Sequence, residues 1–200
     1  METFFIRTAE EKDAKEIHDI YSYYVENTAV TFSTENQSVE EYKKQIAETK
    51  KVYPYFVAQD SNGRILGFIY GHQLRPHEAY NWNVESTVYL APDAPKRRGI
   101  GTALYKKFLE TLSLQGFKYD YGVITSENTA SIEMHKKLGF REIGKFQNAG
   151  NKDGKWHGIF WMQIQVGEIS ENPAAPVPFS ELKIQQECKI KTAKIERLLS

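Results

Sequence analysis

Apolar positions recur with two different periods along the chain and predict alternating helices and strands. Helical spacing follows two capping-box patterns, Thr8-Ala9-Glu10-Glu11 and Ser38-Val39-Glu40-Glu41. Two further helices are predicted over 101–114 and 129–138, ending at Gly116 and Gly139. β-branched and aromatic runs predict strands over 52–58, 64–71, 83–90, 119–124, 141–145 and 156–166. This alternation indicates an α/β domain over residues 1–166.

The composition changes after residue 166, so we treat 167–200 as a separate tail. Residues 168–178 contain three of the seven prolines, which is typical of a linker or of an extended wrapping segment. Phe179 and Ser180 resemble a hydrophobic staple and an N-cap, and predict a helix that runs to Ser200. Its apolar stripe, which includes Ile184 and Cys188, is suited to packing on the domain or on a partner.

Length and composition narrow the class of protein. Two hundred residues with 40% apolar and 13% aromatic side chains suffice for one folded domain and exclude wholesale disorder. The balance of 26 basic against 26 acidic residues disfavours a nucleic-acid binder. The longest apolar stretch, residues 65–71, is far shorter than the roughly 18–20 residues of a membrane helix. With no signal-peptide pattern and a single cysteine, we expect a cytoplasmic protein.

The neutral total conceals an uneven distribution of charge. Residues 1–95 carry 9 basic and 15 acidic side chains, whereas residues 96–166 carry 12 basic and 6 acidic ones. This division suggests an anionic ligand on the second half, although two unrelated solvated faces would give the same counts.

The strongest chemical signal is the turn Lys96-Arg97-Arg98-Gly99-Ile100-Gly101-Thr102, between a strand and an amphipathic helix. Glycines allow close approach of a ligand, and the free N–H groups at a helix start attract phosphate oxygens. The three basic side chains add charge where a pyrophosphate would sit. The alternative is an ordinary glycine-bearing turn with solvated bases.

Two motifs together resemble the GNAT family of N-acetyltransferases. The turn is similar to the family's acetyl-CoA signature, Gln/Arg-x-x-Gly-x-Gly/Ala, with Lys96 at the first position. A second family pattern matches residues 128–140, where Ser131 replaces an alanine and His135 replaces a tyrosine. Over residues 3–166 the order of elements also resembles this family, which implies a mixed central sheet with flanking helices.

Several further segments resemble the phosphinothricin N-acetyltransferases within that family. They are Thr31-Phe32, Tyr53-Pro54, Arg75-Pro76, Ala79-Tyr80-x-Trp82, Glu85-Ser86-Thr87-Val88-Tyr89 and Gly154-Lys155-Trp156-His157. Gly158 stands where the family often has an aspartate. The resemblance implies acetyl transfer from acetyl-CoA to the α-amine of a small amino acid such as phosphinothricin, methionine sulfoximine or methionine sulfone.

The same resemblance implies catalytic roles. Glu85 occupies the position of the general base, directly or through a water, unless it is merely an exposed strand residue. His135 is the expected proton donor to the departing thiolate, with Tyr89 as a competitor. The alternative for His135 is a histidine on the helix surface.

It also implies binding roles. For the cofactor, we expect contacts from Asn128, from the backbone of Val88, Tyr89 and Leu90, and from residues 96–102. Arg75 is the candidate for binding the substrate's acidic group, unless it is only a loop charge. Phe32 and Tyr80 are expected to line the pocket or to belong to the core. The remaining histidines show no metal-ligand spacing, so we expect no metal.

Two other functions share these signals. One is acetylation of protein N-termini or ribosomal proteins, which requires an open acidic peptide groove. The other is a CoA-binding sensor without catalysis, with the tail as its partner site. Family relatives are often homodimers, so a homodimer is expected by analogy, with no membrane or nucleic-acid partner.

Overall fold

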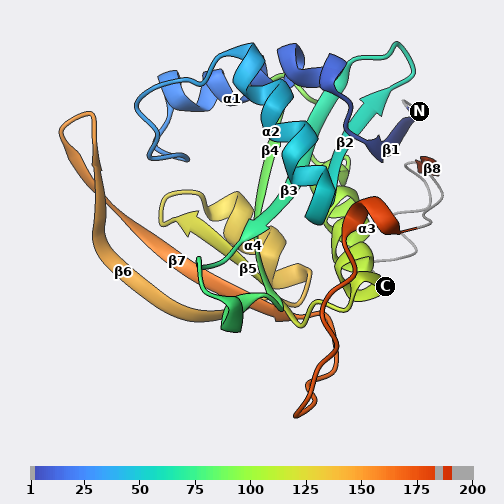
Figure 1. The fold of residues 1–200 in the computed structure, drawn as a ribbon. Coiled ribbons are helices and arrows are strands. Elements are labelled where there is room, and N and C mark those ends of the chain that lie inside the picture. Colours follow the sequence, from blue (N-terminus) through green and yellow to red (C-terminus); the bar gives the residue numbers. More distant parts are fainter. Residues whose placement is uncertain (1–2, 183–186, 191–200) are drawn as a thin grey trace.

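One mixed sheet organises the computed structural model, which describes residues 3–182 and 187–190. Its strand order is β6-β7-β5-β4-β3-β2-β1-β8, and all the neighbouring pairs are antiparallel except β4 and β5. The strands are β1 (Phe4–Thr8), β2 (Tyr55–Asp60), β3 (Ile65–Gln73), β4 (Asn83–Leu90), β5 (Tyr119–Thr125), β6 (Arg141–Lys152), β7 (Lys155–Gln165) and β8 (Glu187–Ile190). The expected mixed sheet with flanking helices is confirmed (Figure 1).

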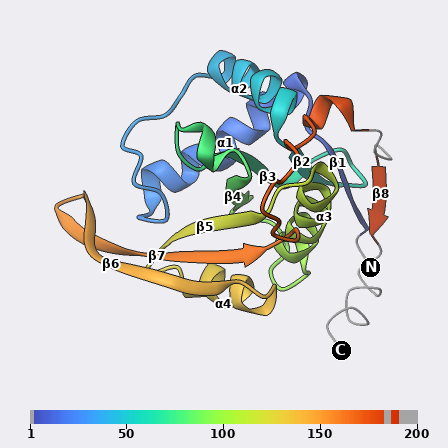
Figure 2. The same ribbon diagram turned by 60° about the horizontal axis from the view of Figure 1, so that its bottom comes forward.

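In the described part of the chain, four α-helices cover the two faces of the sheet. They are α1 (Ala14–Asn27), α2 (Val39–Val52), α3 (Ile100–Gln115) and α4 (Thr129–Lys137). Helices α1 and α2 lie on one face, and α4 lies on the other, as Figure 2 shows. The side chain of Tyr105 in α3 contacts Ser86 of β4, whereas Tyr21 and Tyr24 in α1 pack against Tyr89 of the same strand. Because alternate residues of a strand face opposite sides, α3 covers the face opposite α1.

Predicted features that depend on the residues of a single helix or strand are present in the structure. The strand over 83–90 has the predicted bounds. The Ser38 hydroxyl accepts a hydrogen bond from the Glu41 amide, and the Glu41 carboxylate accepts one from the Ser38 amide. Gly116 ends α3 in the left-handed conformation with φ of 91°. Among the described residues, no helix has the length and apolar character needed to cross a bilayer.

The predicted capping box at Thr8 is wrong. Thr8 is the last residue of β1 and pairs with Phe56 of β2, so it cannot open a helix. The reciprocal cap instead joins Glu10 and Asp13 around a 3-10 turn over Glu11–Asp13. Two hydrogen bonds of 2.6 and 2.8 Å from the Arg7 guanidinium hold the Asp13 carboxylate in place. Because Thr8 pairs with β2, helix α1 begins at Ala14 and not directly after Thr8.

The tail differs from its prediction as well. Residues 187–190 form β8, which pairs antiparallel with β1, so the predicted helix is wrong there; 183–186 and 191–200 lie outside the described residues. Ser180 lies inside a 3-10 turn over Phe179–Glu181, and its hydroxyl donates to the Lys51 carbonyl. Before that turn, Gln115 donates to the carbonyl of Val177, and Trp82 donates to that of Ala174. Residues 174–181 thus wrap along the domain.

Strands β6 and β7 form a long hairpin that extends beyond the neighbouring strands (Figure 1). Lys152 near its tip is buried, and its ammonium donates to the carbonyls of Val25, at 2.7 Å, and Thr31, at 3.0 Å. Val25 belongs to the last turn of α1, whose carbonyls lack helical partners. This lysine therefore joins the hairpin to the end of α1.

Candidate active site

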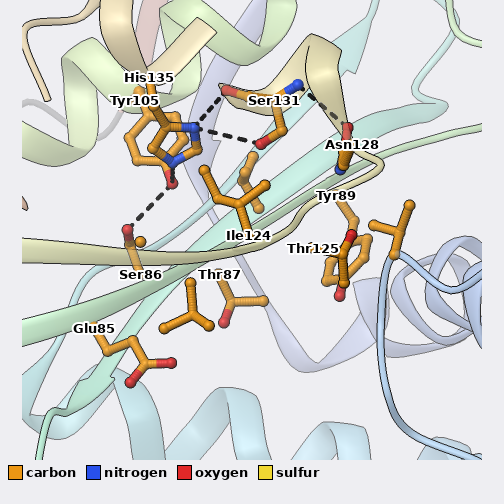
Figure 3. A pocket seen from close by; sticks show the side chains of 14 residues that line it. Glu85, Ser86, Thr87, Tyr89, Tyr105, Ile124, Thr125, Asn128, Ser131 and His135 are labelled. Carbon is orange, nitrogen blue, oxygen red and sulfur yellow. Dashed lines mark hydrogen bonds between the residues drawn. The ribbon is translucent and has the colours of Figure 1, made fainter. Parts of the chain in front are cut away.

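The parallel strands β4 and β5 separate part-way along their length and leave an opening in the sheet. They pair only over residues 83–85 and 119–121, although β4 continues to Leu90 and β5 to Thr125. From Ser86 onward, the edge of β4 that faces β5 is therefore available to a ligand. Side chains from both faces line this opening (Figure 3): Val30, Glu85, Ser86, Thr87, Val88, Tyr89, Tyr105, Gly122, Val123, Ile124, Thr125, Asn128, Ser131 and His135.

Glu85 lies at the point where the two strands begin to separate. Its side chain is 21% exposed, so it is not the exposed strand residue of the alternative reading. Burial raises the pKa of the Glu85 carboxyl, and the positive charges of His72 and Arg75 partly oppose this rise. The His72 Nε2 atom lies 3.9 Å from its Oε1 atom. A carboxylate held in this way is a stronger base than an ordinary glutamate.

Arg75 lies on the same side as Glu85 and is close enough to act on its charge. Its guanidinium stacks 5.2 Å from the centre of the Trp161 ring, and Nη1 donates to the Leu74 carbonyl at 2.8 Å. A guanidinium carries five N–H donors, so this arrangement leaves donors for a bound anion. The stacking holds an otherwise exposed side chain in one place.

The two aromatic candidates lie outside the residues that line the opening. Tyr80 is 40% exposed in a 3-10 turn over Glu78–Tyr80, so it is not a core residue. Phe32 is half-buried, and its ring fills the space that a Cβ atom at Gly150 would occupy. Phe32 also packs 6.1 Å from the His157 ring, and therefore supports the β6–β7 hairpin.

His135 is 1% exposed and is not the surface histidine of the alternative reading. Its Nδ1 atom lies 2.8 Å from the Ser131 carbonyl oxygen, and its Nε2 atom lies 2.7 Å from the Tyr105 hydroxyl (Figure 3). Burial lowers the pKa of His135, although the hydrogen bond to Ser131 opposes the effect. The imidazole is therefore held mainly in its neutral form.

Tyr89 lines the opening from the face that carries Glu85. Its ring packs edge-on against Tyr21, with 5.0 Å between centroids, and also contacts Tyr24. Burial raises the pKa of the Tyr89 phenol far above its ordinary value, and the neighbouring Tyr21 adds to this rise, against a hydrogen bond with Thr31. His135 and Tyr89, the two proton-donor candidates, thus approach the opening from opposite faces.

The basic turn begins α3 with a cradle of backbone N–H groups. Arg97 and Gly99 have φ values of 59° and 73°, and such alternating left-handed residues direct successive amides toward an anion. Lys96, Arg97 and Arg98 are exposed, and Ile100 is buried. Gly99 caps the helix without a side-chain hydrogen bond, so the N–H groups of the first turn, up to Thr102, lack a cap from that side chain.

Gly101 lies close to the side chain of Met134 in α4. A Cβ atom built at Gly101 would lie 2.8 Å from the Met134 sulfur in α4. Packing between α3 and α4 therefore favours a small residue here.

The remaining cofactor candidates lie along the same opening. Asn128 caps α4, and its Oδ1 atom accepts from the Ser131 amide at 3.2 Å, which leaves its amide group for a ligand. Val88 and Tyr89 line the opening, whereas Leu90 lies beyond it. The Leu90 carbonyl accepts a hydrogen bond of 2.7 Å from the Tyr24 hydroxyl.

Sequence reasoning missed three buried polar residues behind His135. They are Tyr105, Ser86 and Asp120. The sequence carried one usable signal, an acidic residue at the second position of the otherwise apolar strand 119–124. Within the described part of the chain, no group of three His, Cys, Asp or Glu side chains is arranged to hold a metal ion.

Comparison with known proteins agrees with this architecture. The family model described as an acetyltransferase (GNAT) domain matches residues 6–161. The chain belongs to the GNAT family of acetyltransferases. This GNAT enzyme is 35% identical over 174 residues to a phosphinothricin N-acetyltransferase of Streptomyces viridochromogenes, covering 86% of this chain and 91% of that protein.

Two further relatives have related names. An L-methionine sulfoximine/L-methionine sulfone acetyltransferase of Pseudomonas paraeruginosa is 32% identical over 127 residues, which cover 64% of this chain and 73% of that protein. Among solved structures, this GNAT chain is similar to a phosphinothricin acetyltransferase from Sinorhizobium meliloti in complex with AcCoA. The TM-score is 0.80 at 29% identity, covering 87% of this chain and 97% of that one.

Proposed function

We propose that residues 1–166 transfer the acetyl group of acetyl-CoA to the α-amine of a small glutamate-like amino acid, of the phosphinothricin, methionine sulfoximine or methionine sulfone type. The observation that carries the proposal is that Arg75 lies close enough to Glu85, which lines the opening, for its positive charge to lower the pKa of the Glu85 carboxyl. An amino acid presents an amine and an acidic group a few bonds apart. The carboxylate of Glu85 suits the amine, and the guanidinium of Arg75 suits the acidic group.

The other side of the site fits acetyl-CoA. The N–H cradle at Arg97 and Gly99, with Lys96 and Arg98 beside it, suits the pyrophosphate. The free edge of β4 and the side-chain amide of Asn128 suit the amide groups of the pantetheine arm. Bound there as a substrate, acetyl-CoA supplies an acetyl group activated as a thioester.

Glu85 acts as the general base in this proposal. A protonated amine cannot attack a carbonyl, so the ammonium first releases one proton to solvent, and Glu85 takes the second, directly or through a water, as the nitrogen attacks. The amine nitrogen then forms a bond to the acetyl carbon while the carbon–sulfur bond breaks, and the sulfur leaves with the electron pair. A positioned base typically contributes about 10²–10⁴-fold to the rate.

In this proposal the leaving thiolate forms next to the buried pair of His135 and Tyr105, which supplies its proton. Their hydrogen-bonded atoms line the opening on the face opposite Glu85, so acid and base approach the acetyl group from two sides. Tyr89 is the competing donor. Its phenol lies among other tyrosines and binds Thr31, an arrangement that suits a wall of the pocket better than proton transfer.

The substrate class is tested by measuring thiol release with phosphinothricin, methionine sulfoximine and methionine sulfone, and by detecting the N-acetyl product by mass spectrometry. Turnover of at least one of these amines supports the proposal. Turnover of only a peptide amine would favour the protein acetyltransferase alternative. Binding of acetyl-CoA without turnover of any amine would favour the non-catalytic sensor.

A further inference from the structure

Four buried polar side chains form a continuous chain of hydrogen bonds behind the opening. Asp120 of β5 contacts Ser86 of β4, Ser86 contacts Tyr105 of α3, and Tyr105 contacts His135 of α4; Figure 3 shows the last two of these contacts. The successive distances are 2.9, 3.2 and 2.7 Å. Every member is at most 7% exposed, and Asp120 is fully buried.

The direction of these hydrogen bonds follows from the His135 end. The Ser131 carbonyl only accepts, so the proton of the neutral imidazole lies on Nδ1. The Nε2 atom must then accept from the Tyr105 hydroxyl. Tyr105 has a single proton and donates it to His135, so a continuous chain requires Tyr105 to accept from Ser86, and Ser86 to accept from a protonated Asp120 carboxyl. With an ionised Asp120, the Ser86 hydroxyl instead donates to Oδ2 of Asp120, at 2.9 Å, or to the Tyr121 carbonyl, at 3.4 Å.

An ionised Asp120 would fit its surroundings poorly. The Ser86 proton would then turn toward Asp120, and the oxygen atoms of Ser86 and Tyr105 would face each other without a proton between them. Among the described residues, Oδ1 of Asp120 also lacks a hydrogen-bond partner, and an unpartnered buried carboxylate oxygen is costly.

The surroundings of Asp120 also favour the neutral acid. Burial raises the pKa of Asp120 well above its ordinary value, and Glu85 on the adjacent strand adds to the rise. Hydrogen bonds from Ser86 and the Tyr121 amide oppose it. On α3 the facing titratable group is Tyr105, and β7 places the apolar Ile164 opposite Asp120 in the sheet register.

Building on the proposed function, we infer that Asp120 is a buried proton store which supplies the leaving thiolate through Ser86, Tyr105 and His135. The chain has a second complete arrangement with the same number of protons. In it Asp120 is a carboxylate that accepts from Ser86, and Ser86 accepts from Tyr105. His135 is then an imidazolium, with its additional proton on Nε2. Negative charge that develops on the sulfur near His135 favours this second arrangement.

The transfer balances over one turnover. The ammonium releases one proton to solvent and a second one to Glu85, the sulfur gains one proton from the Tyr105–His135 end, and Asp120 loses one. Exchange with solvent afterwards removes the proton from Glu85 and restores that of Asp120. Asp120 does not touch either substrate, so it is a positioning and proton-supplying residue, not a catalytic residue.

A spectroscopic test needs neither a variant nor a substrate. We would label the aspartate side-chain carboxyl carbons of the wild-type protein with ¹³C and follow their NMR shifts from neutral to acid pH. One carboxyl that is already protonated near neutral pH, together with ¹⁵N shifts of an Nδ1–H imidazole for His135, is the expected result. Aspartates that are all ionised near neutral pH would overturn the inference. Neither outcome depends on which amine is acetylated.

A kinetic test distinguishes a proton-supplying role of Asp120 from a purely structural one. In Asp120→Asn the side-chain amide can still donate to Ser86, so a purely structural role predicts unchanged rates. The proton store predicts a fall in kcat of about tenfold or more, the lower part of the range for proton transfer, with unchanged KM for both substrates. The solvent deuterium isotope effect on kcat should also decrease.

Thr111→Val is the matched control, because Thr111 is buried on the same helix as Tyr105 and donates only locally, to the Lys107 carbonyl. The control should keep the wild-type kcat. A folded Asp120→Asn protein with wild-type kcat and isotope effect would overturn the inference, while acetyl transfer itself would stand.

Discussion

Glu85 and Ser86 are consecutive residues of β4, and their side chains lie on opposite faces of the sheet. The Glu85 carboxylate lies 3.9 Å from His72 on one face, whereas the Ser86 hydroxyl lies 3.2 Å from the Tyr105 hydroxyl on the other. A single strand therefore separates the groups suited to the amine from the groups suited to the thiolate. The opening between β4 and β5 connects the two faces at this point.

The pairing of Arg75 with the substrate's acidic group predicts a specific binding defect. Arg75→Gln should raise KM for the amino acid about 10- to 100-fold, because a hydrogen bond to a charged group contributes about 1.5–3 kcal/mol. KM for acetyl-CoA should stay the same. Arg141→Gln, an exposed arginine on β6, is the control. Equal KM values for the two variants would remove Arg75 from the substrate site.

A substitution at Gly122 tests whether the position of the His135 imidazole matters for the rate. A Cβ atom at Gly122 would lie 2.9 Å from Nε2 of His135, so Gly122→Ala must displace the imidazole. We expect kcat to fall about 10- to 100-fold, since small misplacements of reacting groups have effects of this size. Gly144→Ala, in a strand with no atom within 4 Å of the new Cβ, is the control. Unchanged kcat in a folded Gly122→Ala protein would contradict a role for His135.

The basic turn predicts a defect in acetyl-CoA binding that depends on salt. Arg98→Gln should raise KM for acetyl-CoA about two- to fivefold at low ionic strength, because an exposed charge pair contributes about 0.2–1 kcal/mol. The difference from wild type should shrink as salt is added. Initial rates at two ionic strengths measure this. A salt-independent difference would indicate that Arg98 acts through structure and not through charge.

The hydrogen bonds of the buried Lys152 predict that its replacement lowers the free energy of unfolding. Replacing it with Met removes two hydrogen bonds to the carbonyls of Val25 and Thr31. Urea unfolding should show a loss of about 1.5–3 kcal/mol, the range for a hydrogen bond to a charged group. Lys155→Met, at an exposed position of the same hairpin, should change the free energy of unfolding little. Equal stability of the two variants would show that Lys152 does not anchor the hairpin.

Sequence patterns predicted elements well where the determinants are local. The Ser38 cap and the glycine stop at Gly116 depend on residues within a few positions of each other, and both are present. The tail was predicted as a helix from its own stripe, but residues 187–190 pair with the edge of β1. An available strand edge is a tertiary feature, and no local pattern in the tail indicates it.

The same distinction applies to the site. The motifs placed Glu85, Asn128 and His135 along one opening, because each motif is tied to a particular strand or helix start. The chain from Asp120 to His135 joins four different elements, so its contacts depend on packing rather than spacing. Tyr105 has the helical spacing of a core residue, and only the structure shows that its hydroxyl binds His135.

The kinetics of Glu85→Gln test the central claim most directly. Thiol release from acetyl-CoA with the best amino acid substrate should fall about 10²–10⁴-fold, the usual contribution of a general base. The wild-type rate should also decrease as pH falls through the raised pKa of Glu85, because only the carboxylate accepts a proton. The variant should lack this decrease. A Glu85→Gln protein with the wild-type rate and the same pH dependence would contradict the assignment of Glu85 as the base.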